Sequence, residues 1–363
     1  DQCILEFYNP SLYSFSSIHL WCNKSIANQI NYYPWLKVKI PIASNRSIFN
    51  QLYWERFCLP KILKNLNIDI LFNVDAGSIC AFRPSVTLSQ DMLSYEPGEI
   101  KRYGISKARL RLILLRYIQN NSLKNSTSAI FLTKYAADLI QKSAGKISTY
   151  KVIPHGVDKI FYRENLLNIE NNNNKIKILY VSNTAPYKHQ WHVVKAIKYL
   201  IKKYPLLKLE LVGGGQGKSQ KKLLRAIKLH DPKMQFTTIL DNQSRNKVAE
   251  LMHNCDIFLF ASSCENLPIT LLEAMASKLP IACSNRGPMP SVLKNGGLYF
   301  DPENYLSISK TLEIYLNDKN LCISKSNLAK IYSEKYSWSN CSDETFKWIE
   351  YTFKNYIIKK QKN

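Results

Sequence analysis

The stretch CDIFLFASSCENLPITLLEAMASKLP, residues 255–280, decides the fold that this sequence predicts. Its first part, Asp256–Ala261, is a short apolar run typical of a buried strand in a parallel sheet. Residues 270–277 favour a helix, and two carboxylates, Glu265 and Glu273, bracket the loop and the helix start. Ligands bind open α/β sheets where a strand ends and a helix begins, so we expect a ligand site here.

The alternation of strand and helix continues on both sides of this stretch. In the second half we expect strands at 177–182, 207–212, 234–240, 256–261, 280–284 and 298–300, and helices at 190–204, 219–229, 245–254, 270–277 and from Tyr305 onward. In the first half we expect strands at 2–8, 37–41, 68–73, 85–89, 128–133 and 150–154, and helices at 50–65, 101–124 and 134–143. Alternating strands and helices predict parallel, doubly wound sheets.

A polar linker is expected between the two halves. Residues 165–174 contain the run Asn171–Asn174, which is typical of a low-complexity connection. A chain of 363 residues is long enough for two domains with sizeable cores. The sequence therefore predicts an α/β protein with two Rossmann-like domains that meet near residue 160 and face each other across a cleft.

The net charge of +23 comes from 50 Lys and Arg against 27 Asp and Glu. The excess is spread over both halves, with 20 basic against 10 acidic residues up to Ile160 and 30 against 17 after it. A nucleic acid, an anionic membrane surface or a merely Lys-rich genome would each explain it. Because no nucleic-acid-binding motif is present, we expect no nucleic-acid partner and favour the compositional explanation, with the membrane surface next.

Residues 101–124 form a basic amphipathic segment with two interpretations. In the first, which we favour, it is a surface helix whose apolar stripe packs on the sheet. In the second, the helix also docks on an anionic membrane face. No run approaches the 18 apolar residues that a spanning helix needs.

The nine cysteines are scattered and contain no C-x-x-C pair. Several lie in apolar runs, which predicts small buried residues in a reducing, cytoplasmic compartment. The six histidines are dispersed, and no Asp-x-Asp occurs, so we expect no metal site. Neither G-x-G-x-x-G nor a P-loop motif is present, which argues against dehydrogenases and P-loop ATPases.

Three loops follow predicted strands of the second half and should open at one edge of the sheet. The first runs from Asn183 to His189 and contains Lys188, the second contains Gly213, Gly214 and Gly215, and the third spans residues 262–267. A cation, a glycine-rich loop and a helix N-terminus suit a diphosphate. The two nearby glutamates suit the hydroxyls of a sugar or a ribose.

The motif Glu265-x7-Glu273 within SSCENLPITLLEAMASKLP, preceded by Lys188 and LVGGG, resembles glycosyltransferase family 4, which consists of retaining enzymes of the GT-B fold. WERFCLPKIL, SQDML, IFLTKYAADLI and IPHGVD resemble the acceptor-domain segments of that family, so the resemblance extends over most of the chain. The spellings ENLPITLLEA and VSNTAPYKHQ are most similar to bacterial surface-polysaccharide mannosyltransferases.

The resemblance implies a role for each candidate residue. Lys188 would neutralise the donor diphosphate, Glu265 would hold donor-sugar hydroxyls near the reacting carbon, and Glu273 would bind the ribose. Asn183, the glycines 213–215 and the backbone at Asn266 and Leu267 would complete the donor site, Asp91 would place the acceptor, and His155, Gly156 and Asp158 would form a hinge. Residues 1–160 would then bind the acceptor and residues 161–337 the nucleotide sugar, with a helix at 338–363 completing the first domain.

The implied function is transfer of a hexose to a lipid-linked or polysaccharide acceptor in cell-surface glycan synthesis. The favoured sugar is mannose, with GDP-mannose as the donor. The resemblance implies front-face transfer at the inner face of the plasma membrane, with no metal or cofactor; a covalent intermediate on Glu265 is the lesser interpretation. The alternatives are a UDP-sugar donor on the same fold, and an inactive fragment that binds anionic surfaces.

The sequence departs from the family pattern at three places. Ser182 and Asn183 stand where many members have Gly-Arg, so one phosphate cation is missing. Pro268 stands where Gly is frequent and offers no N–H. Residues 2–7 resemble the second strand of the family, so we expect that roughly 30–40 residues with a first strand are absent, the size of a βα unit.

Overall fold

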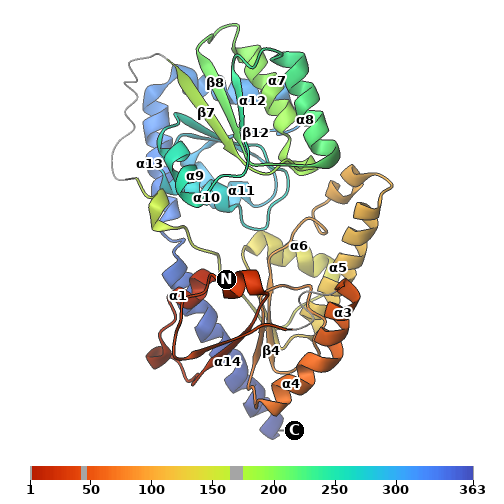
Figure 1. Cartoon of the computed structure of the whole chain (residues 1–363). Coiled ribbons are helices and arrows are strands. Elements are labelled where there is room, and N and C mark those ends of the chain that lie inside the picture. The colour runs from red at the N-terminus through yellow and green to blue at the C-terminus, as the bar shows by residue number, and fades with distance from the viewer. Residues whose placement is uncertain (1, 42–46, 164–174, 363) are drawn as a thin grey trace. The chain divides into compact units, whose positions relative to one another are not determined.

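The computed structural model describes residues 2–41, 47–163 and 175–362 (Figure 1). The predicted linker at residues 165–174 lies outside the described residues. The chain divides into two compact units, which we call unit 1 and unit 2. Unit 1 comprises Asp1–Tyr95, Leu110–Pro154 and Trp338–Asn363, and unit 2 comprises Glu96–Arg109 and His155–Ser337.

Unit 2 is built on a six-stranded parallel sheet with the order β12-β11-β10-β7-β8-β9. Its strands are β7 (Ile176–Val181), β8 (Leu207–Val212), β9 (Thr237–Leu240), β10 (Ile257–Phe260), β11 (Ile281–Ser284) and β12 (Leu298–Phe300). The strand order reverses between β7 and β10, which is the switch point at which open α/β sheets bind ligands. Every strand begins or ends within three residues of its predicted position.

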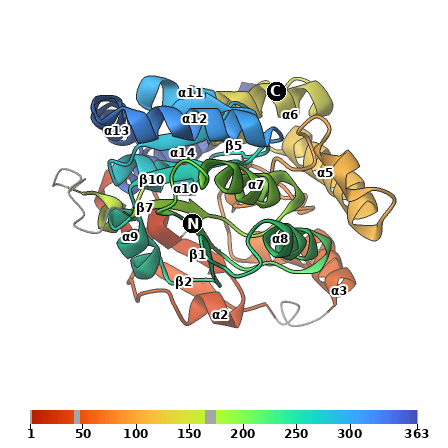
Figure 2. The same ribbon diagram turned by 90° about the horizontal axis from the view of Figure 1, so that it is seen from above.

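Helices cover both faces of this sheet. One face carries α7 (Gln190–Leu200), α8 (Gly217–His230) and α12 (Tyr305–Asn317), and α7 packs against both of the others. The other face carries α9 (Arg245–His253), α10 (Ile269–Ala276), α11 (Met289–Leu293) and α13 (Lys319–Ser333). Figure 2 shows α7 and α8 side by side. Right-handed crossovers between parallel strands produce this division, because the chain runs outward in one direction from β7 and in the other from β10.

Unit 1 contains a four-stranded parallel sheet and a separate parallel pair. The sheet has the order β3-β4-β5-β6, and the pair joins β1 and β2. These strands are β1 (Ile18–Trp21), β2 (Leu36–Lys39), β3 (Leu71–Asn73), β4 (Ser85–Ser89), β5 (Ser128–Phe131) and β6 (Tyr150–Val152). The predicted α/β class with parallel sheets in two Rossmann-like parts is therefore confirmed.

The helices of unit 1 include one that returns from the far end of the chain. They are α1 (Gln2–Glu6), α2 (Lys24–Ala27), α3 (Ile48–Tyr53), η3 (Trp54–Cys58), α4 (Leu59–Asn65), α5 (Lys107–Asn125), α6 (Lys134–Ala144) and α14 (Trp338–Lys362). On α14, the Ser342 hydroxyl donates to the Ile4 carbonyl at 2.7 Å, and the Thr352 hydroxyl lies 2.8 Å from that of Ser128. Its contacts reach both α1 and β4.

The strand predicted at residues 2–8 is wrong, because residues 2–6 form the helix α1. A strand would place Ile4, Glu6 and Tyr8 on one face. In the structure Ile4 and Tyr8 are buried against unit 1, whereas Glu6 is exposed. A helical turn explains this difference, because it places Ile4 and Glu6 on different faces. The resemblance of this segment to the second strand of the family therefore does not hold.

The helix predicted at 101–124 is broken, and its apolar stripe is not packed on the sheet. The short helix η4 (Glu99–Tyr103) ends at Gly104, whose φ is +56°, and α5 begins at Lys107. Leu110, Leu114 and Tyr117 on α5 are 58 %, 56 % and 68 % exposed. The favoured interpretation of this segment is therefore contradicted, because only the last turns of α5 bury side chains.

Candidate functional site

Three loops of unit 2 meet at the carboxyl edge of the sheet. They follow β7, β8 and β10, which are neighbours in the order β10-β7-β8. Parallel strands end at the same edge, so the loops at 182–189, 213–217 and 261–267 lie around the switch point. The three predicted ligand loops thus occupy one site.

Lys188 and Glu265 form an ion pair across two of these loops. Their side chains are 11 % and 16 % exposed, and 77 residues separate them in the chain. Two aromatic rings lie under the ammonium group: its Nζ is 5.1 Å from the ring centroid of Tyr187 and 5.5 Å from that of Phe260. Negative ring faces stabilise a desolvated cation. The structure therefore places these two predicted residues together.

Two further hydrogen bonds to backbone carbonyls hold the loop that contains Lys188. The Ser263 N–H donates to the Tyr187 carbonyl at 2.9 Å, and the Tyr180 hydroxyl donates to the Lys188 carbonyl at 2.7 Å. Lys188 ends the short helix η6 (Pro186–Lys188), so its backbone is fixed on both sides. The ion pair is consequently held by a rigid frame.

The glycine loop packs tightly against the loop that follows β7. Gly213 has φ +119°, and a Cβ there would lie 2.5 Å from the Ser182 carbonyl oxygen. A Cβ on Gly215 would lie 2.4 Å from the Cβ of Thr184. The Gly214 N–H, predicted to face an anion, donates instead to the Asn242 side chain at 2.9 Å. The loop therefore serves close packing at least as much as anion contact.

A cavity of about 430 Å³ opens beside this loop. It is lined by Gly214, Gly215, Gln216, Asp241 and Asn242. Helix α8 begins here at Gly217 with no side-chain cap, so its first N–H groups are free for a ligand or water. Asp241 and Asn242 were not among the predicted site residues, although they directly follow β9 at the same edge of the sheet.

Glu273 belongs to a second charged group. It lies on α10, 6 % exposed, with its Oε1 4.0 Å from the Arg245 guanidinium. Burial raises the pKa of Glu273 to about 7, and Arg245 only partly opposes this. Arg245 also lies 3.4 Å from Asp158. Arg245 was not among the predicted site residues, although it begins α9 directly after the N-cap Ser244.

The remaining predicted donor-site residues surround α10 and the first loop. Asn266 and Leu267 are buried just before α10, whose N-cap is Pro268, and Asn183 is exposed after β7. Because Pro268 lacks an N–H, the first donors of α10 come from residues further along the helix.

The predicted hinge residues lie where the chain enters unit 2. His155 and Gly156 are buried there, and burial lowers the pKa of His155 to about 4. The Val157 N–H donates to the Tyr336 carbonyl at 2.9 Å. Asp158 caps the short helix η5 (Lys159–Phe161) through the Ile160 N–H at 3.1 Å.

Asp91 lies in unit 1, two residues after β4 ends. Its Oδ1 accepts from the Leu93 N–H at 3.0 Å, and its Oδ2 lies 3.5 Å from the Gln119 amide nitrogen on α5. The carboxylate is half-buried at the carboxyl edge of its own sheet. Its predicted role toward the acceptor stays a prediction.

Comparison with known proteins shows similarity to glycosyltransferases. Residues 163–332 match the family model described as "Glycosyl transferases group 1". The chain is similar to an uncharacterized glycosyltransferase of Haemophilus influenzae, with 25 % identity over 92 % of this chain and 90 % of that protein. It is 30 % identical to O-antigen chain mannosyltransferase B of Escherichia coli over 24 % of this chain and 23 % of that enzyme.

Its fold is similar to that of HepE of Anabaena, solved in complex with UDP. The TM-score is 0.70 with 17 % sequence identity, over 95 % of this chain and 94 % of that one. At this sequence identity the similarity concerns the fold alone.

The buried carboxyl group of Glu273 predicts a pH-dependent stability. Its pKa rises from 4.5 to about 7 on folding, so unfolding releases its proton between these values. The contribution of Glu273 to the free energy of unfolding, roughly 3 kcal/mol, is therefore fully present below pH 4.5 and is lost as the pH rises through 7. We expect the thermal midpoint of the wild type to fall between pH 5 and 8, and that of Glu273→Gln to fall less. Glu250→Gln, an exposed carboxylate on α9, is the control; equal slopes for wild type and Glu273→Gln would contradict the assignment.

Proposed function

We propose that this chain, which matches the group 1 glycosyltransferase family model over residues 163–332 and has the GT-B fold, moves a hexose from a nucleotide sugar to a lipid-linked or polysaccharide acceptor with retained configuration. One observation carries this proposal: the Lys188–Glu265 pair at the sheet's switch point, between a glycine loop and the start of α10. A cation beside a carboxylate at this edge suits a diphosphate joined to a sugar.

The ion pair suggests how the donor is bound. A donor diphosphate offers Lys188 a stronger partner than a single carboxylate, because it carries more negative charge. Glu265 would then be released and could accept hydrogen bonds from the sugar hydroxyls. When the donor binds, Lys188 would therefore exchange Glu265 for the diphosphate. Glu265 would exchange Lys188 for the sugar hydroxyls. Neither charge would remain buried without a partner during this exchange.

The same arrangement supports catalysis through the leaving group. When the bond between sugar and phosphate breaks, negative charge grows on the diphosphate. Lys188, fixed by η6 and by two aromatic rings, would stabilise that charge without reorganising. We propose that the acceptor hydroxyl attacks from the face that the diphosphate leaves and passes its proton to the phosphate oxygen. Asp91 would help to place the acceptor.

For the donor we propose GDP-mannose. The Asp241 carboxylate in the cavity beside the glycine loop could accept from the N1 and N2 hydrogens of guanine. The similarity to an O-antigen chain mannosyltransferase agrees with this choice of sugar. A UDP-sugar is the second candidate, because the structurally similar HepE was solved with UDP.

A panel of nucleotide sugars tests the donor. Purified protein is incubated with GDP-mannose, UDP-glucose, UDP-galactose and UDP-N-acetylglucosamine, and nucleotide release is measured with and without a lipid-linked glycan acceptor. We expect release of GDP above that of UDP, with at least a tenfold preference. Asp241→Ala should reduce the preference. Faster release of UDP would replace the proposed donor, and no release from any donor would contradict the proposed transfer.

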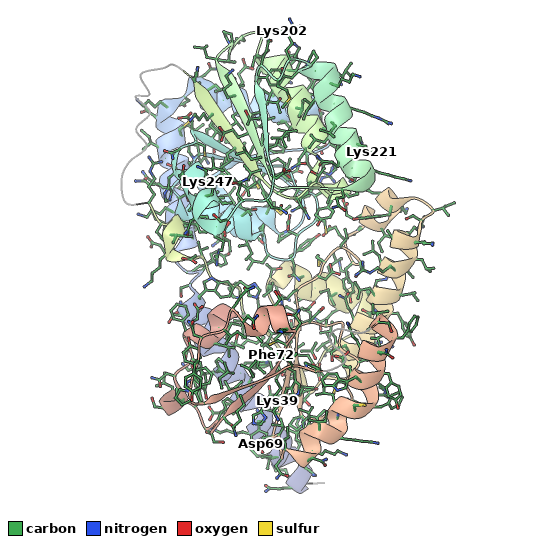
Figure 3. All side chains as sticks on the ribbon, in the orientation of Figure 1. Lys39, Asp69, Phe72, Lys202, Lys221 and Lys247 are labelled. Carbon is green, nitrogen blue, oxygen red and sulfur yellow. The ribbon has the colours of Figure 1, made fainter. Side chains whose placement is uncertain are left out.

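Lys188→Ala and Glu265→Ala should each lower the transfer rate by a factor of 100 or more. Removing one electrostatic stabiliser of a developing charge typically has an effect of about this size. Lys188→Ala should also weaken binding of the free nucleoside diphosphate, whereas Glu265→Ala should leave that binding intact or tighten it, since Glu265 no longer competes for Lys188. The control is Lys221→Ala, an exposed lysine on α8 (Figure 3). Calorimetric titration would contradict the roles if both variants bound the diphosphate equally.

We also propose that α5 docks on an anionic membrane face. Leu110, Leu114 and Tyr117 are exposed beside the basic residues Lys107 and Arg111. Exposed apolar residues among cations suit an interface of acyl chains and anionic headgroups. None of the helices in the described part of the chain is long and apolar enough to cross a bilayer.

Vesicle flotation tests this docking. The wild type should float with phosphatidylglycerol vesicles and lose most of this binding in 0.5 M salt or on pure phosphatidylcholine. The double variant Leu114→Ser with Tyr117→Ser should bind at least tenfold more weakly, because it removes the apolar anchor. Lys202→Ser, an exposed residue of unit 2, is the control. Equal flotation of the double variant and the wild type would contradict the proposal.

A further inference from the structure

A short segment of the chain leaves unit 1, joins unit 2 and returns. It comprises Glu96–Arg109, and we call it the strap. The strap contains η4, and η4 contacts η6, the helix that ends in Lys188. Glu99 at the start of η4 is 3 % exposed although it is a carboxylate. A charge buried this deeply requires partners that satisfy it.

One carboxylate oxygen of Glu99 is bound by the loop that contains Glu265. The Ser263 hydroxyl donates to Glu99 Oε1 at 2.7 Å, and His189 Nε2 lies 2.8 Å from the same hydroxyl oxygen. Burial, with the nearby Arg102 charge, lowers the pKa of His189 to about 3, so its ring is neutral. Since a hydroxyl has a single proton, Ser263 must donate to Glu99 and accept from the Nε2–H of His189.

The other carboxylate oxygen of Glu99 is fixed by Arg102. Its Nε donates to Glu99 Oε2 at 2.8 Å, while its two terminal nitrogens donate to Glu303 at 2.6 and 3.0 Å. This contact to Glu303 is a bidentate fork, and Arg102 lowers the pKa of Glu303 to about 2. Glu99 therefore has both oxygens engaged and a fixed orientation.

We propose that Glu99 is a positioning residue for the donor site. It orders the Ser263 hydroxyl, and Ser263 with His189 joins the loop after β10 to the loop after β7. Lys188 is the neighbour of His189, and Glu265 follows Ser263 by two residues. The join therefore lies directly beside the ion pair that the proposed function depends on, and it sets the separation of the two loops before the donor arrives.

The loss of Glu99 has a specific consequence in this geometry. The Ser263 hydroxyl also lies 3.3 Å from the Tyr187 carbonyl, which is a second acceptor within reach. Without the carboxylate, the hydroxyl would turn to Tyr187 and its lone pairs would no longer face His189 in the same way. The loops would keep their backbone bond at Ser263, and the ordered link from Ser263 to His189 would be replaced by a longer hydrogen bond to the Tyr187 carbonyl.

The test uses Glu99→Gln, Glu99→Ala, Ser263→Ala and the double variant Glu99→Ala with Ser263→Ala. The control is Lys101→Ala, an exposed side chain on the same helix η4. Amide hydrogen exchange is measured on the free full-length protein for residues 183–191 and 261–268. We expect exchange at least fivefold faster in these two segments for Glu99→Ala and Ser263→Ala, and near wild-type exchange for Lys101→Ala and for the rest of unit 2.

Steady-state kinetics on the donor chosen by the nucleotide-sugar panel form the second arm. We expect kcat/KM to fall about 10- to 100-fold for Glu99→Ala, with part of the loss in kcat, and to fall less for Glu99→Gln, whose amide oxygen still accepts from Ser263. The double variant should be no worse than the poorer single variant. Additive losses, unchanged exchange at 261–268 or faster exchange throughout unit 2 would each overturn the positioning role. The exchange arm needs no donor, so it stands even where the proposed function fails.

Discussion

The candidate site depends on one ion pair, that of Lys188 with Glu265. Both side chains are almost buried, and a buried charge without a partner destabilises a protein by several kcal/mol. The loops after β7 and β10 must therefore stay close enough for the pair to form. The neighbouring positions of these strands meet that requirement, and the further bonds between the loops maintain it. A resting pair of this kind also keeps two charges ready while most of their surface is shielded from water.

The donor half of the site could be predicted because its signals are local. Each loop residue of interest follows a strand whose apolar run is evident in the sequence, and parallel strands end at one edge. The sequence therefore predicts that Lys188 and Glu265 lie at the same edge of the sheet. The strands of unit 2 were placed well for the same reason, since their runs are buried on both faces and are bounded by polar turns.

What could not be predicted depends on contacts between distant segments. Helix α1 is helical because α14, more than 330 residues away, packs on it and Ser342 bonds to Ile4. Arg245 is placed in the site by its contact with Glu273, and Glu99 by its contact with Ser263. No spacing in the sequence links either pair. The broken helix at Gly104 has a local signal in the glycine itself, but the contacts of η4 within unit 2, such as that of Arg102 with Glu303, have none.

The connectivity of the two units has a mechanical consequence. The chain passes between them at residues 95/96, 109/110, 154/155 and 337/338, and the second of these passages lies inside the continuous helix α5. Helical hydrogen bonds stiffen that passage against bending, unlike a flexible loop. Four chain passages, one of them helical, therefore constrain the connection more than a single flexible linker would.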